Sequence, residues 1–265
     1  MGGESLGDCF KESFLKQGKK KAITFLREGQ IETEISYLQL HRDSNRMART
    51  FQDLGVAKTD RVILCIQKSL TFVTAHLALQ KIGAISVPLN PGFKKSEMDY
   101  LLHDADPKLI LSEPDKAGLI AEIDSSLTTL IVDTQKPYQD IDFFRSATQE
   151  YARVDIEPDD SGLIIYTSGT TGKPKGAVLT QKNLVHDAKN VIHVWEISAT
   201  DVLCHALPFF HVHGLCFALH TSLLAGAHVL MLDQFSPEGV INVLEKKESS
   251  TPVRYLWRSL RCTAS

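Results

Sequence analysis

Short apolar segments alternate with stretches of helical periodicity along the first 130 residues of the chain. Six of these segments have the length and the β-branched content of strands, and they cover residues 23–26, 31–35, 61–66, 84–87, 109–111 and 130–132. Glu28-Gly29 between the first two predicts a β-hairpin. Helices are predicted at 69–81, 96–105 and 117–123, and the second of them starts with the capping pattern Ser96-x-x-Asp99. The alternation favours an α/β fold with a largely parallel sheet that is covered on both faces.

A second set of elements follows a polar stretch at 133–161, which we interpret as a surface connection between two α/β units. Strands are predicted at 162–166, 177–179, 202–206 and 228–232, and helices at 214–224 and 237–247. A further helix is capped by Thr180 and has an expected inward stripe of Leu184, Ala188, Val191 and Trp195. The whole pattern predicts layered, largely parallel sheets with flanking helices.

Composition narrows the class of protein. The 265 residues contain 29 Lys and Arg against 32 Asp and Glu, a net charge of -3, which argues against a nucleic-acid binder. Five cysteines at irregular spacing form neither a disulfide framework nor a paired zinc motif, and they fit a reducing cytosol: Cys9, Cys65, Cys204, Cys216 and Cys262. The first twenty residues lack the apolar core of a signal peptide, so a cytoplasmic location is expected.

One uncharged run, Gly214 to Leu232, imitates a membrane span. Its polar residues, among them His220 and His228, and the break at Gly226 divide it into two parts. A helix, a turn and a strand therefore explain the run better than a bilayer helix does, and no membrane span is expected.

The segment Tyr166 to Gly176 reads Tyr-Thr-Ser-Gly-Thr-Thr-Gly-Lys-Pro-Lys-Gly and directly follows a predicted strand. Its glycines allow close approach of the backbone to a ligand, and its hydroxyls and lysines offer donors and positive charge to a polyphosphate. The spacing excludes a Walker loop, and the following strand-like residues exclude a dinucleotide fingerprint. A plain surface hairpin is the alternative.

Histidines supply the other candidate chemistry. His211-x-His213, with Cys204, His205, Cys216 or His220, suggests a transition-metal site, but the spacing matches no recognised zinc pattern, and no protein-bound metal is predicted. We expect His220 and His228 to be partly buried, hydrogen-bonded residues. Four aspartates are interpreted as turn and cap residues, and three aromatic residues as core or pocket wall: Asp104, Asp106, Asp159, Asp160, Phe209, Phe210 and Trp195.

The segment from Tyr166 to Gly176 resembles the signature of the adenylate-forming (AMP-binding) enzymes, which include the acyl-CoA synthetases. Three other segments resemble this family in the expected order: 35–40, 79–90 and 207–214. The resemblance spans residues 35 to about 248. It implies that residues 1–250 are a partial N-terminal AMP-binding domain, followed by a non-matching tail at 251–265. Malonyl- and methylmalonyl-CoA synthetases look nearest, with fatty-acid ligases next.

The resemblance implies an acid–thiol ligase that activates a carboxylic acid with ATP as an acyl-adenylate and transfers the acyl group to coenzyme A. The residues that would hold the β- and γ-phosphates, with Mg²⁺ bridging, are Thr167, Ser168, Gly169, Thr170, Thr171, Gly172 and Lys175. Lys173 and Gly176 complete the predicted set, although Pro174 can turn Lys173 away. His211 matches the family histidine beside the acyl pocket, and His213 is a candidate for the same wall.

The resemblance covers about the first half of a usual family member. It lacks the downstream Tyr-Gly-x-Thr-Glu segment and the C-terminal domain with its catalytic lysine, so this chain alone is expected to be inactive. The tail contains Arg254, Trp257, Arg258 and Arg261, which favours either a broken reading frame or a lipid- or partner-binding tail. The alternative functions are a non-catalytic ATP- or AMP-binding fragment and a structural α/β module.

Overall fold

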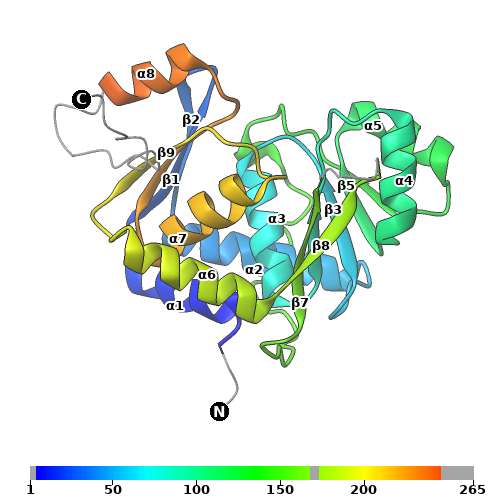
Figure 1. Ribbon diagram of the computed structural model, residues 1–265, viewed down its shortest axis with the longest axis horizontal. Helices are drawn as coiled ribbons and strands as arrows, with labels where there is room; N and C mark the ends of the chain where they lie inside the picture. Colours follow the sequence, from blue (N-terminus) through cyan, green and yellow to red (C-terminus); the bar gives the residue numbers. More distant parts are fainter. Residues whose placement is uncertain (1–3, 168–172, 246–265) are drawn as a thin grey trace. The chain divides into compact units, whose positions relative to one another are not determined.

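Two β-sheets organise the residues that the computed structural model describes, 4–167 and 173–245 (Figure 1). Each sheet belongs to one of two units. The first unit is formed by Met1–Cys9 and His41–His186, and the second by Phe10–Leu40 and Asp187–Ser265. The unit boundaries therefore fall within the helices α1 (Leu6–Gln17), α2 (Tyr37–Asp53) and α6 (Gln181–Val194). The predicted loop residues Ser168 to Gly172, the predicted tail and Cys262 lie outside the described residues.

The first unit contains a six-stranded sheet with the order β6-β5-β3-β4-β7-β8. Its strands are β3 (Arg61–Cys65), β4 (Ile85–Pro88), β5 (Leu109–Ser112), β6 (Thr129–Ile131), β7 (Ser161–Thr167) and β8 (Lys175–Thr180). Five strands run parallel, and β8 pairs antiparallel with β7 at one edge. The predicted α/β class with a largely parallel sheet is confirmed.

Helices cover both faces of this sheet. α4 (Lys95–Ala105) and α5 (Pro114–Ile123) pack on one face, where Met98, Leu101 and Leu102 join Ile63 and Val87 in a buried cluster. The fully buried α3 (Leu70–Lys81) contacts β3 and β4, and Figure 1 shows it on the opposite face from α4. Among its buried polar side chains, Thr74, His76 and Gln80 are hydrogen-bonded to other buried groups, as a fully buried helix requires.

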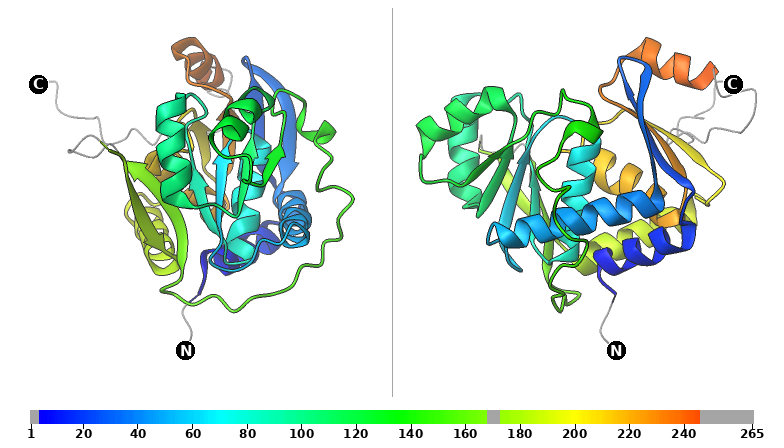
Figure 2. Two further views of the ribbon diagram at one scale, coloured as in Figure 1. Left: turned by 90° about the vertical axis from the view of Figure 1, so that its right-hand side faces the viewer. Right: turned by 180° about the vertical axis from the view of Figure 1, so that it is seen from behind.

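The second unit contains a four-stranded sheet with the order β2-β1-β10-β9. Its strands are β1 (Lys21–Arg27), β2 (Gln30–Ser36), β9 (Val202–His205) and β10 (His228–Leu232). The predicted hairpin is present. The φ angles are positive at both turn residues, 49° at Glu28 and 76° at Gly29, as in a two-residue type I′ turn. The π-helix η2 (His213–His220), α7 (Thr221–Ala225) and α8 (Pro237–Glu245) complete the unit, and Figure 2 shows α8 beside the β1–β2 hairpin.

At two predicted helix ends, the structure changes the role expected of a named residue. α4 starts at Lys95, and the carboxylate of Glu97 accepts a hydrogen bond from the Lys94 N–H at 3.0 Å, so the predicted Ser96 cap is wrong. The structure ends α6 at Val194, because the backbone turns at Glu196 with φ at 52°. Trp195 therefore lies beyond the helix and is 42% exposed, which corrects its assignment to the inward stripe and to the core.

The connection between β6 and β7 is more buried than its polar sequence predicts. It contains the short 3-10 helix η1 (Tyr138–Asp140), and the side chains of Tyr138, Ile141 and Phe144 are buried. The guanidinium group of Arg145 lies over the rings of Tyr138 and Phe144, with its Cζ atom 4.8 and 4.9 Å from the two ring centroids. The stretch is thus anchored by its aromatic residues.

The predicted division of the uncharged run is confirmed: η2 and α7, a turn at Gly226 and the strand β10 take its place. In the described part of the chain, none of the helices has the length and apolarity that a bilayer crossing requires. Four cysteines of that part are in the thiol form, outside any disulfide: Cys9, Cys65, Cys204 and Cys216.

Candidate functional site

The segment with the phosphate-binding composition begins where β7 ends, at the carboxyl edge of the parallel strands of the first unit. In open α/β sheets, ligands bind at this edge, because strand ends and loops leave space there and helix N-termini point towards it. The segment then returns as β8, with Tyr166 opposite Gly176 and Thr167 opposite Lys175. The fold therefore places the two ends of the loop side by side at a position suited to ligand binding.

Of the nine predicted phosphate-site residues, the structure describes Thr167, Lys173, Lys175 and Gly176. Thr167 and both lysines are exposed. The hydroxyl group of Thr167 lies 3.4 Å from the carbonyl oxygen of Lys175. These side chains remain available to an anionic ligand, and their role in phosphate binding stays a prediction.

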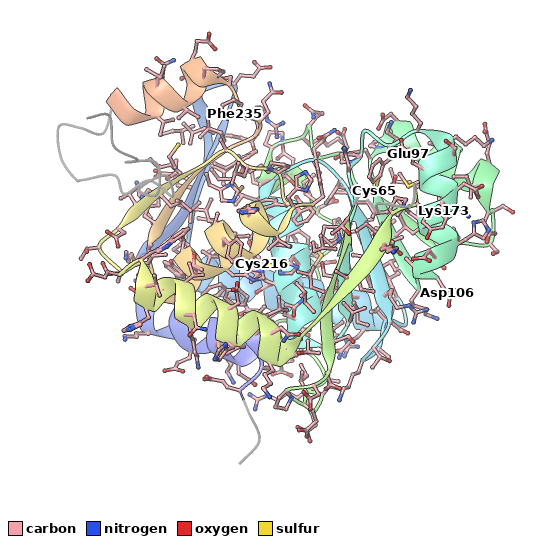
Figure 3. The ribbon with its side chains drawn as sticks, viewed as in Figure 1. Cys65, Glu97, Asp106, Lys173, Cys216 and Phe235 are labelled. Atoms are coloured by element: carbon pink, nitrogen blue, oxygen red, sulfur yellow. The ribbon has the colours of Figure 1, made fainter. Side chains whose placement is uncertain are left out.

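Lys173 lies against α4 (Figure 3). Its Nζ atom is 5.3 Å from the ring centroid of Tyr100, which is the geometry of a cation–π contact. The next residue, Pro174, accepts a hydrogen bond from the hydroxyl group of Tyr100 through its carbonyl oxygen at 3.1 Å. Lys173 thus contacts α4, and whether Pro174 turns it away from the phosphates stays a prediction.

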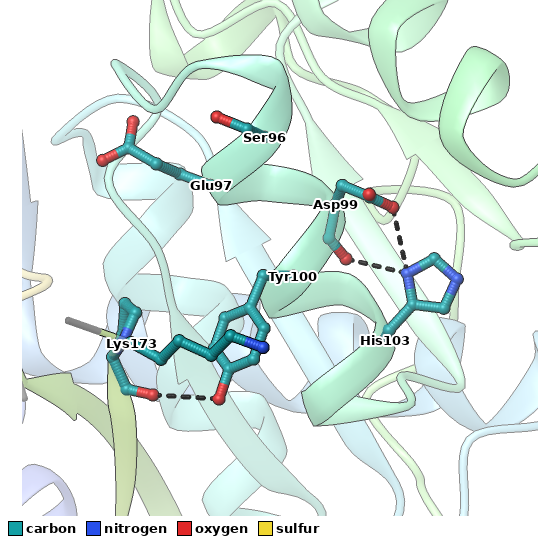
Figure 4. Close-up of a pocket in the computed structure, with 7 residues that line it drawn as sticks. Ser96, Glu97, Asp99, Tyr100, His103 and Lys173 are labelled. Atoms are coloured by element: carbon teal, nitrogen blue, oxygen red, sulfur yellow. Dashed lines mark hydrogen bonds and ion pairs between the residues drawn. The ribbon is translucent and has the colours of Figure 1, made fainter. Parts of the chain in front are cut away.

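A pocket of about 520 Å³ lies between α4 and the start of β8 (Figure 4). Its lining combines one lysine with several acidic and aromatic groups: Ser96, Glu97, Asp99, Tyr100, His103, Lys173 and Pro174. The Nδ1 atom of His103 lies 3.1 Å from the carboxylate of Asp99. The pKa of His103 is raised, mainly because its ring is hydrogen-bonded to the Asp99 backbone. Desolvation opposes this increase, and nearby carboxylates add to it. Asp99 and Glu97 make this pocket a poor anion site.

The interpretation of Asp104 as a turn or cap residue is wrong. Asp104 lies inside α4, and its carboxylate accepts a hydrogen bond from the hydroxyl group of Tyr166 at 2.7 Å. Burial, followed by this hydrogen bond, raises the pKa of Tyr166, so its phenol remains a donor. Asp106 and Asp160 do act as predicted, at the C-cap of α4 and in the turn before β7.

Gly176 has a packing reason to be glycine. A Cβ atom at this position would lie 3.0 Å from a side-chain carbon of Ile164 and 3.4 Å from the ring of Tyr166. Because Gly176 has no side chain, the Tyr166 ring can pack across the hairpin at this position.

His211 belongs to the second unit and is exposed. Its carbonyl oxygen accepts hydrogen bonds from the backbone N–H groups of Gly214 and Leu215, both at 3.1 Å, so it forms the first turn that leads into η2. Its ring lies 4.6 Å from that of Phe210. His213 is also exposed and contacts Phe217, with ring centroids 5.1 Å apart. Both imidazoles are accessible to a small molecule.

Sequence reasoning missed the residue that closes this turn. His205 is 1% exposed, and its Nε2 atom lies 2.8 Å from the carbonyl oxygen of Gly214. A Cβ atom on Gly214 would lie 2.1 Å from the carbonyl oxygen of Pro208, so only glycine fits at this close approach. His205 at the end of β9 and Gly214 together hold the segment that carries His211.

The other histidines have structural surroundings. His228 is half-buried and lies 2.9 Å from the Thr24 hydroxyl, as predicted, whereas His220 is fully buried against Phe10 rather than partly buried. Over residues 4–167 and 173–245, no group of three or more His, Cys, Asp or Glu side chains is arranged to hold a metal ion.

Comparison with known proteins decides the family. The family model described as AMP-binding enzyme matches residues 10–250. The chain belongs to the AMP-binding enzyme family. This confirms the resemblance found in the Tyr166–Gly176 segment, and with it the expectation of an adenylate-forming fold.

Relatives of this AMP-binding chain are CoA ligases. An oxalate–CoA ligase of Arabidopsis thaliana is 34% identical over 204 residues, which cover 74% of this chain and 40% of the relative. A crotonobetaine/carnitine–CoA ligase of Salmonella heidelberg is 29% identical over 264 residues, which cover 94% of this chain and 50% of the relative. The chain spans about half the length of these curated relatives or less.

Solved structures agree with the family. ATP-bound MatB from Rhodopseudomonas palustris is 30% identical with a TM-score of 0.82, covering 93% of this chain and 48% of that one. The inhibitor-bound N-terminal domain of FACL13 from Mycobacterium tuberculosis is 26% identical with a TM-score of 0.79, covering 92% of this chain and 61% of that one. The fold of the AMP-binding enzymes is therefore shared over nearly all of this chain.

Proposed function

We propose that this chain carries the ATP-phosphate loop and part of the acyl pocket of an ATP-dependent acid–CoA ligase. The observation that carries the proposal is the loop between β7 and β8, which combines glycines, hydroxyls and lysines at the carboxyl edge of a parallel sheet in a chain of the AMP-binding family. The reaction would activate a carboxylic acid as its acyl-adenylate and then transfer the acyl group to the thiol of coenzyme A.

The physical difficulty of the first step is that a carboxylate must approach the α-phosphate of a polyanion. Backbone amides, hydroxyls and a positive charge aimed at the β- and γ-phosphates lower this barrier, because they stabilise charge that leaves with pyrophosphate. In our proposal the loop residues and Lys175 supply these groups. Mg²⁺ would accompany ATP and supply further positive charge.

His211 is proposed to contact the acyl substrate. Its ring is exposed at the start of η2, and the buried pair His205 and Gly214 fixes its backbone. A π-helix beside it supports a functional role, because π-helical turns are frequent at functional sites.

We propose no single acid. The ligases similar to this chain act on acids as different as oxalate, crotonobetaine or carnitine, and 4-coumarate, by their names.

Two assays on the purified chain test the proposal. The first measures ATP binding by titration calorimetry, and the second measures acid-dependent exchange of pyrophosphate into ATP, with hydroxylamine to trap the acyl-adenylate. We expect ATP binding that is lost in the double variant Thr170→Ala, Lys175→Ala. Unchanged binding in this variant would remove the loop assignment.

The second assay tests the expectation that this chain alone is inactive. Acid-dependent exchange would overturn that expectation and support an adenylating enzyme directly, whereas ATP binding without exchange is the result expected both of half a ligase and of a non-catalytic ATP- or AMP-binding protein. No binding of ATP at all would leave only the structural α/β module.

A further inference from the structure

We propose that Tyr100 and Asp104, one turn apart on α4, are positioning residues that hold both ends of the phosphate-binding loop. The inference rests on the proposed function, because it assigns two supporting residues to the same loop. Neither residue lies in the Tyr166–Gly176 segment, and neither is expected to touch ATP.

The first contact holds the end of β7. The hydroxyl group of Tyr166 donates a hydrogen bond to Oδ2 of Asp104 at 2.7 Å, and Tyr166 directly precedes the first predicted phosphate-site residue, Thr167. A short bond to a carboxylate belongs to the stronger class of hydrogen bonds. The entry to the loop is thereby tied to α4.

The second contact holds the start of β8. The hydroxyl group of Tyr100 donates to the carbonyl oxygen of Pro174 at 3.1 Å, and the ring of Tyr100 faces the ammonium group of Lys173. Pro174 directly precedes Lys175. The exit from the loop is thereby tied to the same face of the same helix, as Figure 4 shows for Tyr100 and Lys173.

α4 is a suitable platform because it is itself fixed. Met98, Leu101 and Leu102 are each 2% exposed or less in the cluster beneath the helix. The rings of Tyr100 and Tyr166 pack against that cluster too, so each hydroxyl group is held at the end of an anchored ring. At the C-terminal end of α4, Arg61 bonds to the side chain of Asp106 at 2.7 Å.

The physical consequence is preorganisation. A loop that binds phosphate through backbone amides and hydroxyls gains most when these groups already point at the ligand, because ordering a free loop opposes binding. Asp104 carries a negative charge near a site for a polyanion, which opposes ATP binding electrostatically. Its place there is explained by the hydrogen bond that it accepts.

Four variants test this inference in the intact chain. Tyr166→Phe and Tyr100→Phe each delete one hydroxyl group and keep the ring. Asp104→Ala removes the acceptor, whereas Asp104→Asn removes the charge and keeps an acceptor oxygen. Asp99→Asn is the matched control, because Asp99 is exposed on the same helix and pairs with His103 rather than with the hairpin.

The first readout is the dissociation constant of ATP. We expect Tyr166→Phe, Tyr100→Phe and Asp104→Ala each to weaken binding by about threefold to tenfold, as for the loss of one hydrogen bond. Asp104→Asn and Asp99→Asn should stay within about twofold of the parent chain, and Tyr166→Phe should add little in the Asp104→Ala background. If Asp104 acted by its charge alone, Asp104→Asn would bind ATP more tightly and Tyr166→Phe would be silent, which would overturn the proposal.

The second readout is amide hydrogen exchange in the absence of nucleotide. We expect faster exchange at Tyr166, Thr167, Lys175 and Gly176 in the deletion variants, with no change at the far end of the hairpin, at Ser161 and Thr180. Unchanged exchange at the loop end overturns the proposal. Faster exchange with unaltered ATP affinity overturns it as well, because the contacts would then order the hairpin without positioning it for phosphate.

The two hypotheses fail in different ways. If the parent chain binds no ATP, the proposed function fails and the positioning role for ATP fails with it, whereas the hydrogen-exchange result still decides whether α4 holds the hairpin. If the parent chain binds ATP and the variants equal it in affinity, only the role of Tyr100 and Asp104 fails.

Discussion

The hydroxyl group of Tyr138 donates a hydrogen bond to the fully buried carboxylate of Asp43 at 2.9 Å. The same hydroxyl group lies 3.0 Å from that of Thr74, and Arg46 and Arg145 approach Asp43 at 3.3 and 3.9 Å. A buried carboxylate is stable only when such partners replace the water that it has lost. Tyr138 thus fastens the long connection between β6 and β7 to α2 and α3.

Tyr138→Phe should lower the free energy of unfolding by about 1–3 kcal/mol, because it leaves the buried carboxylate short of a donor without changing the volume of the ring. Urea unfolding followed by circular dichroism measures the loss. Tyr151→Phe, in the same connection and half-buried, is the control and should change stability by less than about 0.5 kcal/mol. Equal effects of the two variants would contradict the anchoring role of Tyr138.

The two lysines of the loop should differ in their contribution to ATP affinity. Lys175→Ala should weaken ATP binding by about tenfold or more, as for a charge-assisted hydrogen bond. Lys173→Ala should weaken it by only about twofold to threefold, because the ammonium group of Lys173 contacts the Tyr100 ring instead. Titration calorimetry measures the ATP dissociation constants of the two variants. Lys182→Ala on α6 is the control, because it also removes one positive charge.

Gly214→Ala should destabilise the chain by at least about 2 kcal/mol, because the added methyl group collides with the carbonyl oxygen of Pro208. Thermal unfolding measures this effect. Gly118→Ala is the matched control: beyond its own helix backbone, the described residues place no atom within 4 Å of the added Cβ, and it should stabilise α5 by about 0.5–1 kcal/mol. Changes of the same sign in both variants would count against this interpretation of Gly214.

His76 predicts an acid-sensitive step in stability. It is 0% exposed, its Nδ1 atom lies 3.0 Å from the Ser86 hydroxyl, and burial lowers its pKa from 6.5 to about 3. As the pH falls below about 6.5, His76 becomes protonated in the unfolded chain but stays neutral in the folded chain. The free energy of unfolding therefore decreases between about pH 6.5 and pH 3.

The contribution of His76 is measured by comparing urea unfolding of the parent chain and His76→Gln at several pH values. The decrease over this window should be smaller in His76→Gln. His103→Gln should not flatten it, because His103 is exposed and its pKa is raised, which gives the opposite sign. An identical pH dependence in parent and His76→Gln would refute the role of His76.

The elements of the fold were predictable where local composition determines them. The hairpin at Glu28-Gly29 and the strands on both sides of the Tyr166–Gly176 segment lie where their turn residues and apolar runs place them. The prediction that Trp195 belongs to the inward stripe of α6 was wrong, because the 3.6-residue pattern continues in the sequence past the backbone turn that ends the helix.

The candidate site was predictable only in part, because its support comes from distant residues. The bond between Asp104 and Tyr166 joins positions 62 residues apart, and only the parallel sheet brings them together. The contact of His205 with Gly214 is local, yet a histidine at the end of an apolar strand carries no sign of which carbonyl group it will meet. Composition therefore predicts which residues can bind phosphate, and topology determines which residues support them.

The interleaved order of the two units has a consequence for synthesis of the chain on the ribosome. β1 pairs with β10, where Ile23 lies opposite Val229, so the hairpin of β1 and β2 emerges about 200 residues before its neighbour in the sheet exists. At about 5–20 residues per second, that delay lasts about 10–40 s. An isolated hairpin is marginally stable in water. During this time the apolar side chains of β1, among them Ile23, Phe25 and Leu26, therefore lack the sheet that later buries them.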